Sequence, residues 1–280
     1  MDITAAMVSK LRDQTGAGMM ECKRALVECS GDLEKAVDLL RVRGKAGAEK
    51  RAGRAAADGV VAAAISGPTA AMVELNSETD FVARNEEFRA LAASAAEASA
   101  SAGVGDVTAL LAVRLPGGDA LQHALDGVVA RLRENIVLRR CALVRAGDDE
   151  LVNMYVHTVT HKIAVLVRMR GAPDNPDHMA AGRNVAMHIA AAKPRYVRRE
   201  DVPAEVLERE RQVLAEKTRA EGKPEAAIGK IVEGRLGKFY EQACALEQPY
   251  VRDPSVKVAQ MLKPVGVELL EFRMYVVGQE

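Results

Sequence analysis

The sequence is poor in aromatic residues. It contains no tryptophan, and aromatic residues make up only 3% of its 280 positions. Because large aromatic side chains commonly anchor a hydrophobic core, alanine, valine, leucine and methionine must carry most of the packing. The hydrophobic fraction of 49% is high enough for a real core, which argues against a disordered chain. The length allows two domains, or one domain with a small appendage.

The sequence has no excess of either charge. Its 39 Lys and Arg residues balance 39 Asp and Glu residues, giving a formal net charge of +0. A protein that binds nucleic acid must neutralise many phosphates, and a neutral chain exerts no overall attraction on them. Direct binding to nucleic acid is therefore not expected, and any contact with RNA would need a local basic patch.

Paired cysteines and long apolar runs are also lacking. The cysteines lie far apart, without a CxxC pair: Cys22, Cys29, Cys141 and Cys244. This spacing suits neither a zinc site nor a disulfide framework and is typical of reduced, buried thiols. The N-terminus lacks the basic and apolar segments of a signal peptide, and no apolar run has the length of a membrane span. We therefore expect a cytoplasmic protein that does not contact membranes.

Motifs of catalysis are absent as well. No Gly-Lys pair is followed by the Ser or Thr of a phosphate-binding loop, and no dinucleotide-binding or nucleophile-elbow motif occurs. His157 and His161 are four residues apart, a spacing that places two metal ligands on one face of a helix. Their segment instead indicates a strand end and a turn, with no acidic residue between them. The sequence therefore predicts no enzymatic activity, no cofactor and no metal site.

Residues 1–44 show the spacing of three short amphipathic helices. Apolar residues recur every three or four positions, and Thr15–Gly18 and Gly31-Asp32 interrupt the pattern. Gly44 suits the end of the third helix. We expect a helical docking module over 1–44, followed by a basic linker rich in glycine and alanine over 45–57. An alternative for the basic stretch 41–57 is a patch that touches RNA.

From residue 58 the periodicity becomes that of an α+β fold. Two β-like runs around Gly67-Pro68-Thr69 predict a hairpin, and a comparable pair of runs follows in the second half. Each hairpin precedes helical segments and a returning strand: helices at 86–101 and 119–134 with a strand at 136–146, then a helix at 177–192 with a strand at 267–277. This repetition predicts two α+β subdomains with antiparallel sheets, 58–141 and 142–280.

Residues 203–245 interrupt the second subdomain. Two charged helical segments flank the turn Glu221–Pro224, which predicts a projecting helical hairpin. The hairpin is either an ordinary surface element or an arm for docking or oligomerisation. A homodimer or a heterotetramer is compatible with the second interpretation.

One junction between a strand and a helix mixes polar and apolar residues. Phe81 follows Asp80 within the stretch Asn76–Asn85. In one interpretation Phe81 folds back into the core, and Asp80 or Asn85 caps the next helix. In the other, Phe81 protrudes as an aromatic wedge, the type of residue that anchors an interface. The residues alone leave both interpretations open.

Several motifs together resemble the elongation factor Ts family. Leu11–Leu26 resembles its N-terminal signature, and Thr79–Arg84 resembles its second signature. Further similar motifs are Asn135-Ile136, Met187–Ala191 and Gln248–Val251. The resemblance covers essentially the whole chain, with the motifs in the right order, so chance agreement is not credible.

The resemblance implies a non-catalytic exchange factor that binds elongation factor Tu and promotes release of GDP. It implies a ubiquitin-associated-like N-terminal module followed by two α+β subdomains. It also implies that the turn Thr79, Asp80, Phe81 and Val82 inserts near the Mg²⁺ site of the GTPase. Two alternatives stay open: a scaffold that binds another partner through the N-terminal module, and a metal-dependent hydrolase built around His157 and His161.

Further contacts are carried over from the family residue by residue. Arg12, Met19 and Met20 would touch the nucleotide-binding domain of the partner, and His157 would contact another part of it. The sequence departs from the family at 158–164, where relatives usually have glycines. It also ends without the C-terminal helix of some relatives, so binding is expected to rest on the N-terminal module and the core.

Overall fold

The computed structural model describes residues 2–51 and 53–279, with side chains described outside 44–52. The chain divides into two compact units. The first comprises Met1–Leu143, Val156–Ala164 and Tyr275–Glu280, and the second comprises Val144–Tyr155 and Val165–Met274. No helix among the described residues is long and apolar enough to cross a membrane.

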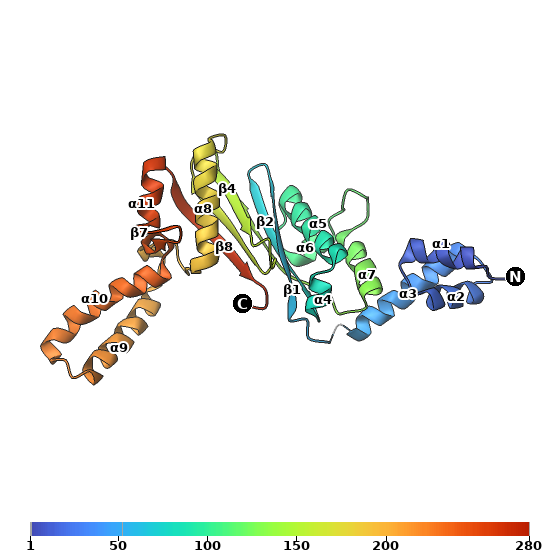
Figure 1. The fold of residues 1–280 in the computed structure, drawn as a ribbon, viewed down its shortest axis with the longest axis horizontal. Coiled ribbons are helices and arrows are strands. Elements are labelled where there is room, and N and C mark those ends of the chain that lie inside the picture. Colours follow the sequence, from blue (N-terminus) through green and yellow to red (C-terminus); the bar gives the residue numbers. More distant parts are fainter. Residues whose placement is uncertain (1, 52, 280) are drawn as a thin grey trace. The chain divides into compact units, whose positions relative to one another are not determined.

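The N-terminal region forms the three predicted helices (Figure 1), namely α1 (Ala5–Thr15), α2 (Met19–Glu28) and α3 (Leu33–Arg51). The Thr4 side chain caps α1 by accepting a hydrogen bond from the Met7 N–H, and Asp32 accepts one from the Lys35 N–H at the start of α3. The apolar faces meet in one small core: Val8, Leu11, Cys22, Ala25, Leu26, Ala36 and Leu40.

The prediction that the third helix ends at Gly44 is wrong, because α3 continues to Arg51. The added residues include Ala, Glu, Lys and Arg, which are strong helix formers. Their propensity offsets the cost of about 1 kcal/mol for each glycine inside a helix. The side chains of 44–52 lie outside the described residues, so the alternative of an RNA contact over 41–57 falls largely outside them too.

The first sheet has the strand order β1-β2-β3: β1 (Asp58–Ser66), β2 (Thr69–Ser77) and β3 (Val137–Arg145). β1 and β2 form the predicted hairpin. Their antiparallel register is unbroken: Asp58 pairs with Ser77 at one end, and Ser66 pairs with Thr69 at the turn. The helices of this part are α4 (Asp80–Ala83), α5 (Glu86–Ala102), α6 (Val107–Leu111) and α7 (Leu121–Leu132). α5 packs on β1 and β2, and the predicted long helices correspond to α5 and α7.

Strand β2 is buried along its whole length, yet it carries the carboxylate of Glu74, which is 0% exposed. Its oxygens accept hydrogen bonds from Arg139 at 3.0 Å, from Arg140 at 2.7 Å and from the Gly278 N–H at 3.0 Å. Burial by itself would raise the pKa of Glu74, but these donors outweigh it and hold the pKa below its ordinary value. The carboxylate thus ties β3 and the end of the chain to the centre of the sheet.

Glu74→Gln is expected to lower the free energy of unfolding by about 2–4 kcal/mol at neutral pH, because two arginines lose their buried partner. Since the folded pKa is lowered, the contribution of the carboxylate is present above its ordinary pKa of 4.5 and is lost as the pH falls below that value. Urea unfolding at pH 7 and pH 4 measures both effects. The difference in the free energy of unfolding between wild type and variant should be smaller at pH 4 than at pH 7. A difference that is independent of pH would contradict this role. Glu97→Gln, on the exposed face of α5, is the control.

The second sheet has the order β4-β5-β8: β4 (Glu150–Val156), β5 (Ile163–Arg170) and β8 (Glu268–Val276). α8 (Pro176–Ala192) follows β5, capped by the Asn175 side chain. The hairpin, helix and returning strand therefore occur twice, as the sequence predicts. The sequence did not predict the short elements β6 (Pro249–Tyr250), β7 (Asp253–Lys257), α11 (Val258–Leu262) and the single 3-10 turns Arg199–Asp201, Ala245–Glu247 and Lys263–Val265.

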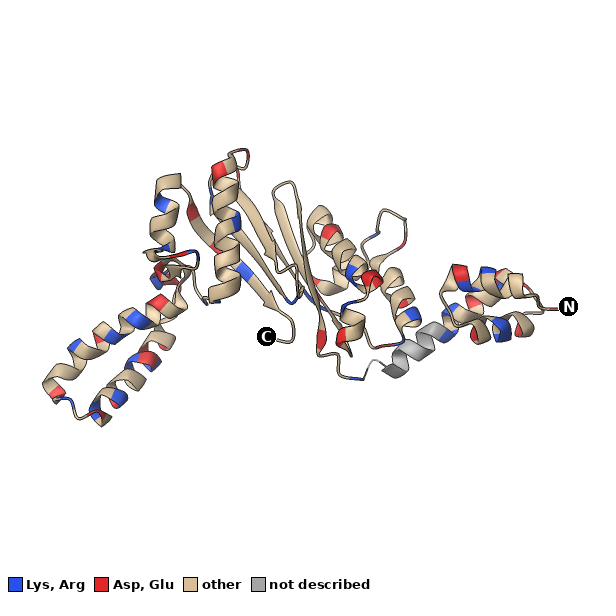
Figure 2. Ribbon diagram, in the orientation of Figure 1, with Lys and Arg blue, Asp and Glu red and all other residues tan. Residues whose placement is uncertain are grey.

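Between α8 and β6 lies the predicted helical hairpin, α9 (Ala204–Ala220) and α10 (Glu225–Ala243). Ile228, Val232 and Leu236 of α10 are buried against α9. Acidic and basic residues alternate along both helices (Figure 2), and Arg235 pairs with Glu221 at 2.5 Å. Exposed pairs of this kind contribute little stability each, so the apolar seam holds the two helices together.

Candidate functional site

Phe81 protrudes from a single helical turn, α4. Its side chain is 82% exposed, whereas the next residues, Val82 and Ala83, are buried in the core below the first sheet. The Thr79 side chain caps α4 by accepting a hydrogen bond from the Val82 N–H. The interpretation that Phe81 folds back into the core is therefore wrong, because Val82 and Ala83 fill that place.

The carboxylate of Glu134 accepts hydrogen bonds from the residues that lead into this turn. One oxygen accepts hydrogen bonds from the N–H groups of Glu78 and Thr79, both at 3.0 Å, and the other accepts one from the Thr79 hydroxyl at 2.5 Å. In return, the Glu78 side chain accepts a hydrogen bond from the Asn135 N–H at 2.7 Å. Hydrogen bonds to an ionised carboxylate are stronger than neutral ones, so this exchange fixes the backbone that leads into α4.

Charged residues surround α4 on its exposed side. Asp80 pairs with Arg84 one turn later at 2.9 Å. The Nε–H of Arg89, on α5, donates to the Ala83 carbonyl at 3.1 Å and so satisfies the end of α4. The Asn85 side chain then caps α5. Phe81 is thus an apolar side chain on a short, fixed and charged turn.

Arg12, Met19 and Met20 lie where α1 gives way to α2. Gly16 ends α1 with φ +66°, a left-handed conformation that glycine adopts without strain. The chain then turns, and α2 begins with Met19 and Met20, whose side chains are 58% and 66% exposed. Arg12 is exposed as well. Neither methionine belongs to the small core of the three helices, so both side chains face away from it.

His157 begins the loop between β4 and β5. Its N–H donates to the Ile163 carbonyl at 2.9 Å, and its own carbonyl accepts from the His161 N–H at 2.7 Å. Burial, with repulsion from Arg89 and His157, lowers the pKa of His161. The segment is a strand end and a turn, as predicted, and no group of three metal-binding side chains occurs among the described residues.

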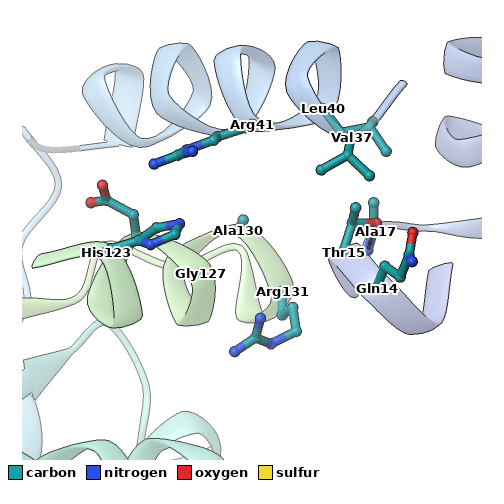
Figure 3. Close-up of a pocket in the computed structure, with 11 residues that line it drawn as sticks. Gln14, Thr15, Ala17, Val37, Leu40, Arg41, His123, Gly127, Ala130 and Arg131 are labelled. Carbon is teal, nitrogen blue, oxygen red and sulfur yellow. Dashed lines mark hydrogen bonds between the residues drawn. The ribbon is translucent and has the colours of Figure 1, made fainter. Parts of the chain in front are cut away.

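Two of the hollows in the first unit lie next to segments that carry predicted binding residues. The larger, about 540 Å³, is bordered by α4 and by the loop after His157: Asp58, Asp80, Ala83, Arg84, Arg89, Val159, Thr160 and Lys162. The smaller, about 190 Å³, is lined by α1, α3 and α7, with Val37 and Leu40 on α3 and Ala130 and Arg131 on α7 (Figure 3). None of the predicted binding residues of the N-terminal module lines the smaller hollow.

The structure therefore brings the predicted residues together in two places. Thr79, Asp80, Phe81 and Val82 form α4 and its cap, and the loop that begins at His157 borders the same hollow as α4. The residues of the N-terminal module gather at the junction of α1 and α2. Sequence reasoning missed Glu134 and Arg89. Glu134 directly precedes the motif Asn135-Ile136, but its partners lie more than fifty residues earlier in the chain.

Comparison with known proteins identifies the family of this chain. The family model described as elongation factor TS matches residues 78–279, which is most of the chain. A known relative, the elongation factor Ts of Rhodospirillum rubrum, is 45% identical over 274 residues, covering 96% of this chain and 88% of the relative. The chain belongs to the elongation factor Ts family. Elongation factor Ts is the nucleotide-exchange factor of elongation factor Tu in translation elongation, and it is not a catalyst.

The family assignment confirms the resemblance on which the functional prediction rested. The matched segment begins at Glu78, at the turn that leads into α4. It includes β3 of the first sheet, all strands of the second sheet, and the helical hairpin of α9 and α10. The relative extends the similarity into the N-terminal module. As an elongation factor Ts, the chain binds elongation factor Tu. A scaffold with a different partner and a metal-dependent hydrolase are thereby set aside.

Proposed function

We propose that this elongation factor Ts releases GDP by inserting the turn Thr79–Val82 into the GTPase domain of elongation factor Tu, close to its Mg²⁺ site. The observation that supports this most directly is the exposure of Phe81 on a turn that Glu134 holds in place. Ordering an exposed aromatic side chain before binding lowers the entropy cost of the interface, so such a residue is suited to act as a wedge.

Phe81 separates helices of the GTPase domain and thereby shifts the groups that hold Mg²⁺ and the β-phosphate. A divalent cation is the largest local charge at a diphosphate, so weakening its coordination weakens GDP strongly. Linkage makes the effect reciprocal: the exchange factor lowers the affinity for GDP by the factor by which GDP lowers the affinity for the exchange factor. Excess GTP then completes the exchange.

Asp80 has a supporting role in this mechanism. Its carboxylate pairs with Arg84, so the pair presents little net charge beside Phe81. When α4 enters the partner, the pair can open, and Asp80 then disturbs the electrostatics of the Mg²⁺ site. Val82 and Thr79 contribute by fixing the turn, one through burial and the other through the cap.

The remaining contacts secure the complex. Arg12, Met19 and Met20 form an exposed patch of one cation and two flexible apolar side chains, which suits binding to the nucleotide-binding domain of the partner. His157 contacts a second part of the partner. We place the complex in the cytoplasm, where translation takes place. Light scattering of the isolated chain and of the complex distinguishes a monomer, a homodimer and a heterotetramer.

The absence of tryptophan allows a direct test of the insertion. Phe81→Trp gives the chain a single tryptophan, and its emission reports the polarity around α4. On addition of nucleotide-free elongation factor Tu, after subtraction of the partner's own spectrum, the emission should shift to shorter wavelength because the ring becomes buried. Ile65→Trp, at the exposed end of β1, is the control and should not shift. Complex formation with no shift at position 81 would refute the insertion.

A further inference from the structure

Phe81 and Val159 are the two most exposed large apolar side chains among the described residues, at 82% and 80%. A single exposed apolar side chain is ordinary on a protein surface. These two, however, belong to segments that border the same hollow of about 540 Å³, α4 on one side and the loop between β4 and β5 on the other. Val159 lines this hollow, and Phe81 belongs to the helical turn that borders it.

The loop that carries Val159 is fixed at several points. The Val61 N–H, on the edge strand β1, donates to the His161 carbonyl at 2.7 Å, and the Val277 N–H donates to the Lys162 carbonyl at 2.9 Å. Lys162 also pairs with Asp58 at 3.1 Å. Val159 is thus held in position before any partner binds, which lowers the entropy cost of using it in an interface.

The charges of the hollow do not cancel. Asp80 pairs with Arg84, and Asp58 pairs with Lys162. Arg89 is the third cation of the lining, and among the described residues no carboxylate lies within ion-pair distance of it. Its Nε–H binds the Ala83 carbonyl, which leaves the two terminal amino groups of the guanidinium to donate elsewhere. The lining therefore carries one uncompensated positive charge.

One positive charge suits a single carboxylate. A guanidinium binds a carboxylate through two parallel hydrogen bonds, and the apolar residues on either side reduce the access of water to such a pair. A phosphate carries more negative charge, and the Asp58 and Asp80 carboxylates on the rim would repel it. An acidic side chain flanked by apolar residues matches both the charge and the rim of the hollow.

We propose that this hollow receives an acidic side chain of elongation factor Tu, with Arg89 binding its carboxylate while Phe81 and Val159 cover the apolar residues beside it. The proposal rests on the proposed function, because it places the hollow in the same interface as α4. It gives the loop after His157 a defined role in binding. Val159 thus adds a second apolar contact beside that of Phe81. Arg89 determines the charge of the partner residue that binds between these two side chains.

The affinity for nucleotide-free elongation factor Tu, measured by isothermal titration calorimetry, tests the proposal. Val159→Ala should weaken binding about threefold to fivefold, and Val159→Asp more than about tenfold, because a second negative charge then faces the carboxylate. Arg89→Gln should weaken binding about tenfold at low salt. Ile65→Ala and Arg145→Gln, which remove an exposed apolar side chain and an exposed cation elsewhere, are the controls and should bind as wild type does.

Salt dependence separates binding of a carboxylate from support of α4. Screening weakens an ion pair between the proteins, so the affinity gained on lowering the salt should be smaller in Arg89→Gln than in wild type. In Val159→Ala that gain should be unchanged. An unchanged gain in Arg89→Gln would show that Arg89 acts only through the Ala83 carbonyl and would overturn the proposal.

Parallel measurement of Phe81→Ala keeps the two proposals distinguishable. If Phe81→Ala weakens binding while Val159→Asp and Arg89→Gln do not, the inference about the hollow is overturned and the proposed function stands. If Phe81→Ala also binds as wild type does, the proposed function itself fails. A loss in Arg89→Gln that appears only with GDP-bound partner would identify the anion as a nucleotide phosphate and would overturn the assignment to an acidic side chain.

Discussion

Phe81→Ala is expected to slow the release of GDP from elongation factor Tu in the complex by about 30-fold or more. An aromatic anchor at the centre of an interface contributes about 2 kcal/mol or more, and each 1.4 kcal/mol corresponds to about a factor of ten in rate. Because the side chain is 82% exposed, its removal should leave the fold intact. Stopped-flow release of a fluorescent GDP, at saturating concentration of the exchange factor, measures the effect.

Two controls make this result specific. The melting temperature of Phe81→Ala should equal that of wild type, because the core below α4 is formed by Val82 and Ala83. Ile65→Ala removes a different exposed apolar side chain and should release GDP at the wild-type rate. Unchanged release in Phe81→Ala would remove Phe81 from the mechanism and leave exchange to the other contacts.

Glu134→Gln should slow the release of GDP about tenfold without unfolding the protein. The carboxylate accepts hydrogen bonds from two backbone N–H groups and one hydroxyl. A neutral amide accepts them more weakly, and its NH₂ group meets donors rather than acceptors. The turn then samples other conformations, and Phe81 is presented correctly for a smaller fraction of the time. The same stopped-flow assay measures the rate, with Glu97→Gln on α5 as the matched control.

A double-mutant cycle shows whether Glu134 acts through Phe81. If it does, the variant that carries both Glu134→Gln and Phe81→Ala should release GDP no more slowly than Phe81→Ala alone. Glu134→Gln acts by misorienting the Phe81 side chain, and the double variant lacks that side chain. Independent effects would instead multiply. A double variant that loses the product of the two single effects would contradict the positioning role of Glu134.

Much of the fold was predictable because its signals are local. Apolar spacing, caps and turn residues identify the three N-terminal helices, the hairpin of β1 and β2, and the pair α9 and α10. The end of α3 was not predicted, since glycine is a helix terminator in some contexts and is tolerated in others, and the alanine and charged residues around Gly47 favoured continuation.

The candidate site was predictable only in part. Its motif, Thr79–Val82, stands out in the sequence, but the exposure of Phe81 depends on what else fills the core. Glu134 acts on residues more than fifty positions away, and the hollow joins α4 to a loop nearly eighty residues later. Contacts of this range follow from the tertiary fold and leave no periodic pattern, so a single sequence cannot specify them.

The most direct test of the mechanism is the Mg²⁺ dependence of GDP release. Stopped-flow release from elongation factor Tu is measured with and without this chain, at millimolar Mg²⁺ and after chelation of Mg²⁺. If the inserted turn acts by disturbing the Mg²⁺ site, the chain should accelerate release strongly with Mg²⁺ present and much less once the ion has been removed. An acceleration of equal size under both conditions would contradict the account, because the exchange factor would then act without the ion.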